Sequence, residues 1–183
     1  EVLIKSSNIG IVKIGSLIKP DTLYHYMRQF GFGAPTGIDF PGEAPGVTHP
    51  PARWSKTSLF NIPMGHEVMV TLLQMTSAMG TIANNGDLMQ PYMVAKIEDQ
   101  AGVALREKKP SVKRHVIDVE TAKKMRHILY RAVEEGTGKM AKINGIPAGG
   151  KTGTAQKVLS GGRGYSHNNF MSSFVGFAPV EAP

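Results

Sequence analysis

The chain has 183 residues, of which 41% are apolar, and a formal net charge of +7. This length and composition predict one domain with its own hydrophobic core. The lack of cysteine excludes disulfides and thiolate metal sites, and no apolar run approaches the ~18 residues that a membrane-spanning helix needs. The positive charge suits a nucleic acid, an anionic membrane or an acidic substrate, although a basic surface alone explains it. Because no basic run is interleaved with aromatic residues, we predict no nucleic-acid partner.

Four helices are predicted from capping residues, apolar spacing and glycine stops. The first is capped by Ser7 or Asn8 and runs to Ile18. The others cover Asp21 to Phe30, Val68 to Ile82 and, after the cap Asp118, the residues up to Glu135, whereas residues 31 to 63 read as a loop. The side chains expected to face the core are Val68, Leu72, Met75, Met79 and Ile82 in the third helix and Ala122, Met125, Leu129 and Ala132 in the fourth.

Strands are expected in the second half of the chain. Residues 93 to 98 and 103 to 107 flank a turn and predict a hairpin, and residues 112 to 117 are expected to be extended. Residues 151 to 158 and 169 to 177 predict two further strands around a glycine-rich, mobile loop from Leu159 to Asn168. Hairpin pairing makes these strands antiparallel, so the predicted fold class is α+β.

The segment GGKTGTAQK, residues 149 to 157, indicates a binding edge. Its glycines suggest a strand that another molecule can approach closely. Lys151 and the hydroxyls of Thr152 and Thr154 are suited to hold a terminal carboxylate, and the Thr154 N–H is suited to stabilise an oxyanion. The alternative is a strand start that is merely rich in glycine and carries a solvated lysine.

A second motif, Ser6-Ser7-Asn8, lies 145 positions before Lys151-Thr152-Gly153. By itself it reads as an ordinary helix cap, or as a serine that passes protons and an asparagine that binds a peptide amide. The order of the two motifs is that of the serine-nucleophile set of penicillin-binding proteins and β-lactamases, in which a Ser-x-x-Lys motif comes first.

Several longer segments carry the same resemblance through nearly the whole chain. They are KSSNIGIVKIG, FGFGAPTGIDFPGEAPG, PMGHEVMVTLLQMTSAMGTIANNG, EEGTGK and GGKTGTAQK. Together they resemble the transpeptidase domain of class B penicillin-binding proteins, most closely the cell-division type. The resemblance implies a penicillin-binding protein/serine β-lactamase-like fold, an antiparallel sheet flanked by helices, here incomplete at both ends.

The resemblance also implies an activity. Such enzymes are peptidoglycan D,D-transpeptidases, in which a serine attacks the D-Ala-D-Ala end of a stem peptide and the resulting acyl-enzyme is resolved by an amine of a neighbouring stem. β-Lactams acylate the same serine. The implied partners are stem peptides, β-lactams and cell-wall synthesis proteins. The implied location is the bacterial envelope, outside the cytoplasmic membrane, with an anchor in an N-terminal segment that this chain lacks.

Roles transfer to this sequence by position. The resemblance implies that Ser6 belongs to the proton-relay network, that Asn8 contacts the amide of the acyl group and that Lys151 hydrogen-bonds Ser6. Thr152 and Thr154 are implied to bind the carboxylate, while Gly153 leaves the approach open. No cofactor is implied, and no metal is predicted because the six histidines show no paired ligand spacing.

The nucleophile is the missing motif. We expect it before Glu1, and we expect a further strand and helix after Pro183, so that the chain alone is not acylated. The one internal match, Ser16-Leu-Ile-Lys19, follows Ser6 and lies near a helix C-terminus, where the dipole disfavours an alkoxide. The alternatives are a β-lactam sensor or β-lactamase of the same superfamily, a non-catalytic scaffold domain and, with little support, a nucleic-acid binder.

Overall fold

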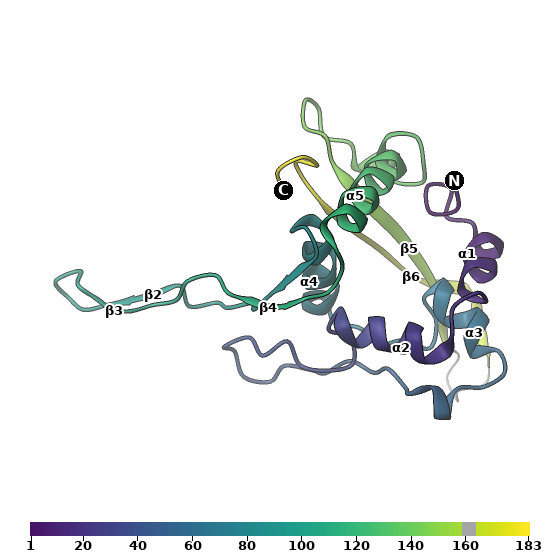
Figure 1. Cartoon of the computed structure of the whole chain (residues 1–183), viewed down its shortest axis with the longest axis horizontal. Helices are drawn as coiled ribbons and strands as arrows, with labels where there is room; N and C mark the ends of the chain where they lie inside the picture. The colour runs from purple at the N-terminus through teal and green to yellow at the C-terminus, as the bar shows by residue number, and fades with distance from the viewer. Residues whose placement is uncertain (159–163) are drawn as a thin grey trace.

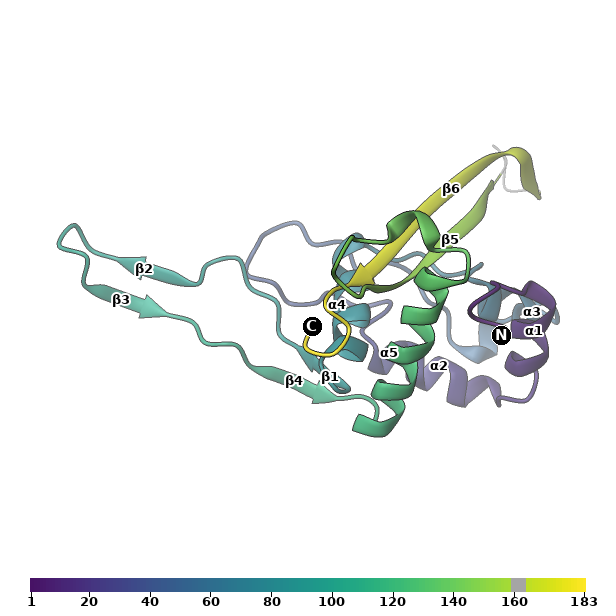
Figure 2. The same cartoon turned by 90° about the horizontal axis from the view of Figure 1, so that it is seen from above.

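The fold combines helices with antiparallel strand pairs, which confirms the predicted α+β class (Figure 1). A computed structural model describes residues 1–158 and 164–183. Helices α4 (Leu72–Ala83) and α5 (Val119–Glu134) pack against the pair of strands β5 (Gly149–Val158) and β6 (Tyr165–Phe177) (Figures 1 and 2). Helices α1 (Asn8–Gly15) and α3 (Ser58–Asn61) lie together near the N-terminus. The hairpin of β2 (Lys96–Glu98) and β3 (Ala104–Glu107) projects away from the body. Within the described residues, no helix has the length and apolar character needed to cross a membrane.

The first two helices follow the predicted capping. Helix α1 (Asn8–Gly15) begins after Ser7, whose hydroxyl accepts a hydrogen bond from the N–H of Gly10 at 3.1 Å. It ends three residues before the predicted Ile18. Helix α2 (Pro20–Gln29) ends before Gly31, which has a φ of +96°. Glycine tolerates this left-handed conformation, so it stops the helix as predicted.

The predicted loop from residue 31 to residue 63 is wrong in its second half. This half contains the 3₁₀ turn η1 (Pro51–Arg53), helix α3 (Ser58–Asn61) and the 3₁₀ turn η2 (Ile62–Met64). Polar contacts support the short helix, because the buried Ser58 hydroxyl accepts from the N–H of Ser55 and donates to Glu67. Such short turns have no apolar repeat that the sequence could display.

The predicted start of the third helix is also wrong. Helix α4 (Leu72–Ala83) begins after Thr71, which forms a capping box with Gln74. Val68 therefore precedes the helix, and Leu72 is 88% exposed instead of facing the core. The side chains that α4 buries are Gln74, Ala78, Met79 and Thr81. Polar residues occupy part of this buried face because they have hydrogen-bond partners, such as the Ser77 carbonyl for the Thr81 hydroxyl.

Glu43 holds the loop after α2 in place through hydrogen bonds to the loop backbone. Its carboxylate accepts hydrogen bonds from the N–H groups of Thr36 at 2.6 Å and Gly37 at 2.9 Å. Desolvation raises the pKa of the Glu43 carboxyl, but the hydrogen bonds from Thr36, Gly37 and Ile38 outweigh it and lower this pKa below its ordinary value. The charged form of Glu43 therefore stabilises the folded loop.

We expect this loop to make the free energy of unfolding depend on pH. Because the folded-state pKa of Glu43 is lowered, its stabilisation is present above the ordinary glutamate pKa of about 4.3 and is lost as pH falls through the folded-state value. Urea denaturation at stepped pH should therefore show Glu43→Gln destabilised at pH 7 and approaching the wild type at low pH. Glu181→Gln, at an exposed position, is the control. A pH-independent difference between Glu43→Gln and wild type would contradict this account.

Short strands build the projecting part of the molecule. Strand β1 (Asp87–Met89), which was not predicted, pairs antiparallel with β4 (Val112–His115), which lies inside the predicted extended segment. Beyond them, β2 (Lys96–Glu98) and β3 (Ala104–Glu107) form the predicted hairpin. A three-residue strand such as β1 carries too little alternation to be recognised before its partner is known.

Helix α5 (Val119–Glu134) forms the centre of the core. Asp118 caps it by accepting from the N–H of Thr121 at 2.8 Å, as predicted. Its buried side chains are Ala122, Arg126, Leu129, Ala132 and Val133. Three of the four predicted core positions are thus buried, while Met125 is half-buried. The buried Arg126 donates to the carbonyl of Ala83 at 2.9 Å, which joins α5 to the end of α4.

The main strand pair follows the 3₁₀ turn η3 (Lys139–Ala141). Strand β5 (Gly149–Val158) pairs antiparallel with β6 (Tyr165–Phe177), with Lys151 opposite Val175. Both strands are longer than predicted, so residues 165 to 168 of the expected loop are strand. Residues 159 to 163 of that loop lie outside the described residues.

Two glycines of β5 lie against side chains of the neighbouring strand β6. A Cβ atom on Gly150 would lie 2.4 Å from the ring of Phe174, and one on Gly153 would lie 2.6 Å from the hydroxyl of Ser173. Side chains of strand β6 thus approach both glycines closely, while the expected approach of another molecule to Gly153 stays a prediction. At Gly150 this packing needs glycine, because a side chain would also clash with the Val175 carbonyl, whereas at Gly153 the nearest atom is the end of a short serine side chain.

Candidate active site

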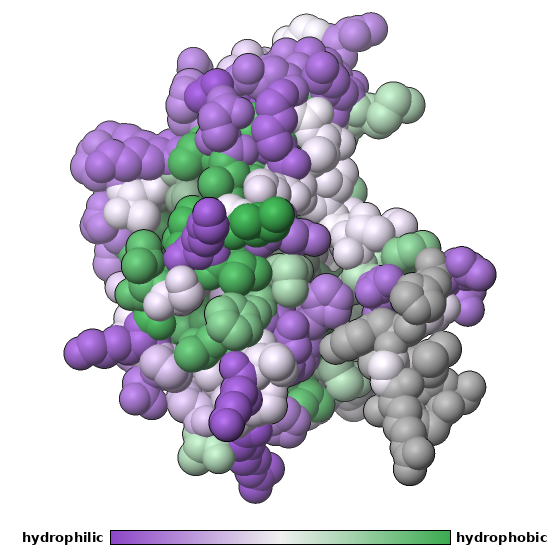
Figure 3. Space-filling view, turned by 90° about the vertical axis from the view of Figure 1, so that its right-hand side faces the viewer, coloured by the Kyte–Doolittle hydropathy of each residue, from purple (hydrophilic) through white to green (hydrophobic). Residues whose placement is uncertain are grey.

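A cleft of about 790 Å³ lies between the N-terminal segment and strand β5. Residues of the two predicted motifs line it: Ser6, Ser7, Asn8, Lys151, Thr152, Gly153 and Thr154. Ile62 and Pro63 line both this cleft and a neighbouring apolar groove. Apolar side chains are prominent on this side of the molecule (Figure 3). The fold thus gathers residues that are 145 positions apart in the sequence around one open cavity.

Lys151 and Ser6 are in direct contact. The Lys151 ammonium donates a hydrogen bond to the Ser6 hydroxyl at 2.9 Å and another to the carbonyl of Thr152 at 2.9 Å. Desolvation by burial lowers the pKa of Lys151 below its ordinary value. A lowered pKa makes the ammonium a better proton donor, and its contact with Ser6 supplies a path for that proton.

Ser6 has a backbone conformation that is rare for a residue with a side chain. Its φ is +53°, in the left-handed region, directly before the helix that Ser7 caps. Such a conformation costs about 1–3 kcal/mol and is found mainly where the surrounding structure needs it. Here it accompanies the contact of the Ser6 hydroxyl with Lys151. Asn8, at the start of α1, is exposed, and its side-chain amide makes no hydrogen bond within the described part of the chain.

Two threonine hydroxyls meet at the other wall of the cleft. The hydroxyl of Thr137 lies 2.9 Å from that of Thr152, and the Lys151 ammonium lies 3.5 Å from the Thr152 hydroxyl. Thr154 continues the same wall. A cation beside several hydroxyls is an arrangement that can hold a carboxylate.

Thr137 is a site residue that the motif analysis did not assign. It follows α5, and its N–H donates to the carbonyl of Ile4 at 3.3 Å, which ties this turn to the N-terminal segment. The one sequence feature that could have pointed to Thr137 as a site residue is its position between two glycines in EEGTGK. Without the fold, nothing connects that turn to Thr152.

Ser16 lies outside the cleft. It follows the last residue of α1, is exposed, and donates its hydroxyl hydrogen bond to the carbonyl of Lys13 at 2.8 Å. It is not among the residues that line the cleft with Lys151. The structure therefore places the internal Ser-x-x-Lys match away from the Ser6–Lys151 pair.

The whole chain matches one protein family. Residues 1–183 match the family described as "Penicillin binding protein transpeptidase domain". The chain belongs to the class B penicillin-binding protein transpeptidase family. The resemblance predicted from the sequence is thereby confirmed.

Relatives of this transpeptidase domain are bacterial proteins. It is 39% identical over 184 residues to stage V sporulation protein D of Bacillus subtilis, and this match covers 100% of the chain and 28% of the relative. It is 33% identical over 186 residues to the penicillin-binding protein PbpB of Mycobacterium tuberculosis, with 98% of the chain and 27% of the relative covered. The chain therefore spans less than a third of the length of these relatives.

Solved structures of the family have the same fold. Penicillin-binding protein 3 of Mycobacterium tuberculosis superposes with a TM-score of 0.92 in its apo form and 0.91 in its aztreonam complex. Sequence identity is 33%, and the match covers 100% of this chain and 42% of that one. The same protein has also been solved with ampicillin.

Proposed function

We propose that this transpeptidase domain acts in a serine D,D-transpeptidase that cross-links peptidoglycan stem peptides and is acylated by β-lactams. The observation that supports this most strongly is the 2.9 Å hydrogen bond from Lys151 to Ser6 in a cleft that also holds Asn8, Thr152 and Thr154. This cleft contains a proton path, an exposed amide and a group of hydroxyls beside a cation. These are the groups that acyl transfer from a peptide with a terminal carboxylate requires.

Each residue has a role in this proposal. Thr152 and Thr154, with Thr137 beside them, bind the terminal carboxylate, and Asn8 binds the amide of the acyl portion. A serine from a segment preceding Glu1 attacks the scissile carbonyl, and the bond to the leaving D-alanine breaks. The proton that the attacking serine loses passes through Ser6 and Lys151 to the leaving amine, while the Thr154 N–H stabilises the oxyanion. An amine of a second stem peptide then takes the acyl group from the serine.

The proposal also covers the cellular location of the domain and the process in which it works. The relatives carry the names of penicillin-binding and sporulation proteins of bacteria, which supports the cell envelope as the location. We propose that the domain works on the outer side of the cytoplasmic membrane, in cell division or a related wall-building process, beside other cell-wall synthesis proteins.

Intact-mass measurement after exposure to benzylpenicillin tests the proposed function. The 183-residue chain is compared with a longer chain in which an upstream Ser-x-x-Lys segment and a C-terminal strand and helix are supplied. We expect one long-lived adduct on the longer chain and none on the shorter, with the modified serine before Glu1. An adduct that is released rapidly would favour a β-lactamase. No adduct on a folded longer chain would contradict the proposal and favour a non-catalytic scaffold.

A further inference from the structure

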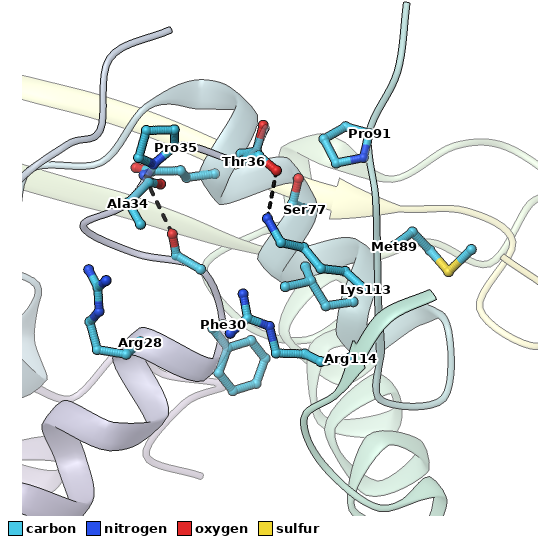
Figure 4. A pocket seen from close by; sticks show the side chains of 13 residues that line it. Arg28, Phe30, Ala34, Pro35, Thr36, Ser77, Met89, Pro91, Lys113 and Arg114 are labelled. Carbon is cyan, nitrogen blue, oxygen red and sulfur yellow. Dashed lines mark hydrogen bonds between the residues drawn. The ribbon is translucent and has the colours of Figure 1, made fainter. Parts of the chain in front are cut away.

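A second pocket, of about 110 Å³, lies between α2, α4 and the β1–β4 pair. None of its lining residues lines the active-site cleft, so binding there can be tested separately from the proposed function. Three cationic side chains line it: Arg28 from α2, and Lys113 and Arg114 from β4. The Arg114 side chain extends from β4 toward α2 (Figure 4), and the Arg28 guanidinium lies by the loop after α2, where it contacts the Phe32 carbonyl.

Among the residues that the structure describes, no acidic side chain lines this pocket. Within the same part of the chain, none of the three cations forms an ion pair. Arg28 donates to the carbonyl of Phe32 at 3.0 Å, and Lys113 to that of Thr36 at 2.7 Å. Neutral carbonyls thus satisfy some donors but do not neutralise the three positive charges, and like charges held together without a counterion repel one another.

Arg114, besides its charge, has a buried hydrogen-bond donor that no described residue satisfies. Its Nε atom is buried, and it has no hydrogen-bond partner among the described residues. A buried N–H without a partner costs free energy that a ligand recovers when it accepts the hydrogen bond. Because a guanidinium presents parallel donors in one plane, its best partner is a planar group with two acceptor oxygens.

We propose that this pocket binds a carboxylate group between Arg28 and Arg114, with Lys113 as the third cation. The volume is several times what one water needs, which admits an anion of a few heavy atoms. Phe30, Leu88, Met89 and Pro91 form apolar walls beside the cations. Such walls favour the short hydrocarbon of a carboxylate ligand over an anion that is polar on every side.

NMR titration of the whole chain with sodium acetate tests the carboxylate site. The arginine Nε–Hε signals are followed at constant ionic strength, with chloride replaced by acetate. We expect the Arg114 and Arg28 signals to shift with saturation, while the signal of Arg106, exposed on β3, does not move. Acetamide, a neutral molecule of the same shape, should produce no shift.

Two variants and a control locate the binding. Arg114→Gln should weaken acetate binding at least tenfold, because one charge-assisted pair of hydrogen bonds is lost. Arg28→Gln should weaken acetate binding by a similar factor, and it replaces Arg114→Gln in the test if that variant does not fold. Arg106→Gln removes the same charge far from the pocket and should leave the affinity unchanged.

Other outcomes separate the sources of the carboxylate or overturn the site. Tighter binding of N-acetylglutamate amide than of acetate would indicate an acidic protein side chain as the occupant, and equal binding a small free carboxylate. A linear, unsaturated response of the Arg114 signal in the wild type would overturn the proposal. So would tighter binding of inorganic phosphate, or loss of acetate affinity in Arg106→Gln equal to that in Arg114→Gln.

Discussion

Replacement of Lys151 by alanine is expected to slow acylation by benzylpenicillin by about 10²–10⁴-fold in the longer chain that carries the nucleophile. The change removes the ammonium that contacts Ser6 and the Thr152 carbonyl. It also removes the positive charge beside the carboxylate-binding hydroxyls. Burial lowers the pKa of Lys151, so that its proton transfers more readily than that of a solvated lysine. The measurement is the second-order rate of adduct formation, followed by intact mass.

Lys157→Ala is the matched control for this experiment. Lys157 lies on the same strand, β5, but is exposed and does not line the cleft. Its replacement removes an equal charge and should leave the acylation rate within about twofold of the wild type, since it touches no reacting group. Equal rates for Lys151→Ala and wild type would show that Lys151 takes no part in proton transfer.

Replacement of Gln74 by leucine is expected to lower the free energy of unfolding by about 3 kcal/mol. Gln74 is 1% exposed, and its amide nitrogen donates to the carbonyls of Ala34 and Pro45, each at 2.8 Å. Its amide oxygen accepts from the N–H of Thr71 at 3.0 Å. Leucine has a similar size but satisfies none of these groups, and each buried group left without a partner costs about 1–3 kcal/mol. Urea denaturation at pH 7 measures the loss.

Gln100→Leu provides the comparison. Gln100 is exposed in the turn of the β2–β3 hairpin. The free energy of unfolding of Gln100→Leu should therefore stay within about 0.5 kcal/mol of the wild-type value. If Gln74→Leu lowered the free energy of unfolding by less than about 1 kcal/mol, water would have to enter the core and replace the hydrogen bonds of the Gln74 amide. The loop after α2 would then not depend on α4 for its conformation.

Local signals in the sequence were sufficient for several elements. Asp118 is predicted as a cap, and Ser7 as one of two candidates with Asn8, because an N-cap acts on the N–H groups of its own helix. Gly31 was recognised as a stop because only its own backbone dihedrals are involved. For α4, the apolar spacing predicts a start at Val68, whereas the Thr71–Gln74 capping box sets the start at Leu72. The helix therefore begins four residues later than the spacing predicts, and Leu72 is exposed instead of facing the core.

By itself, the sequence determined the family, the fold class and the two motifs. The family and the motifs are read from stretches of consecutive residues, and the fold class from caps, apolar spacing and turns, which also act between residues close together in the chain. The family resemblance already implied the contact of Lys151 with Ser6, which the structure contains. Only the tertiary structure decided that Thr137 joins Thr152 and that β1 pairs with β4. It also decided that β6 side chains fill the space over the β5 glycines, and that Arg28 and Arg114 share one pocket. Each of these contacts joins residues far apart along the chain, and such contacts form only when packing brings distant segments together.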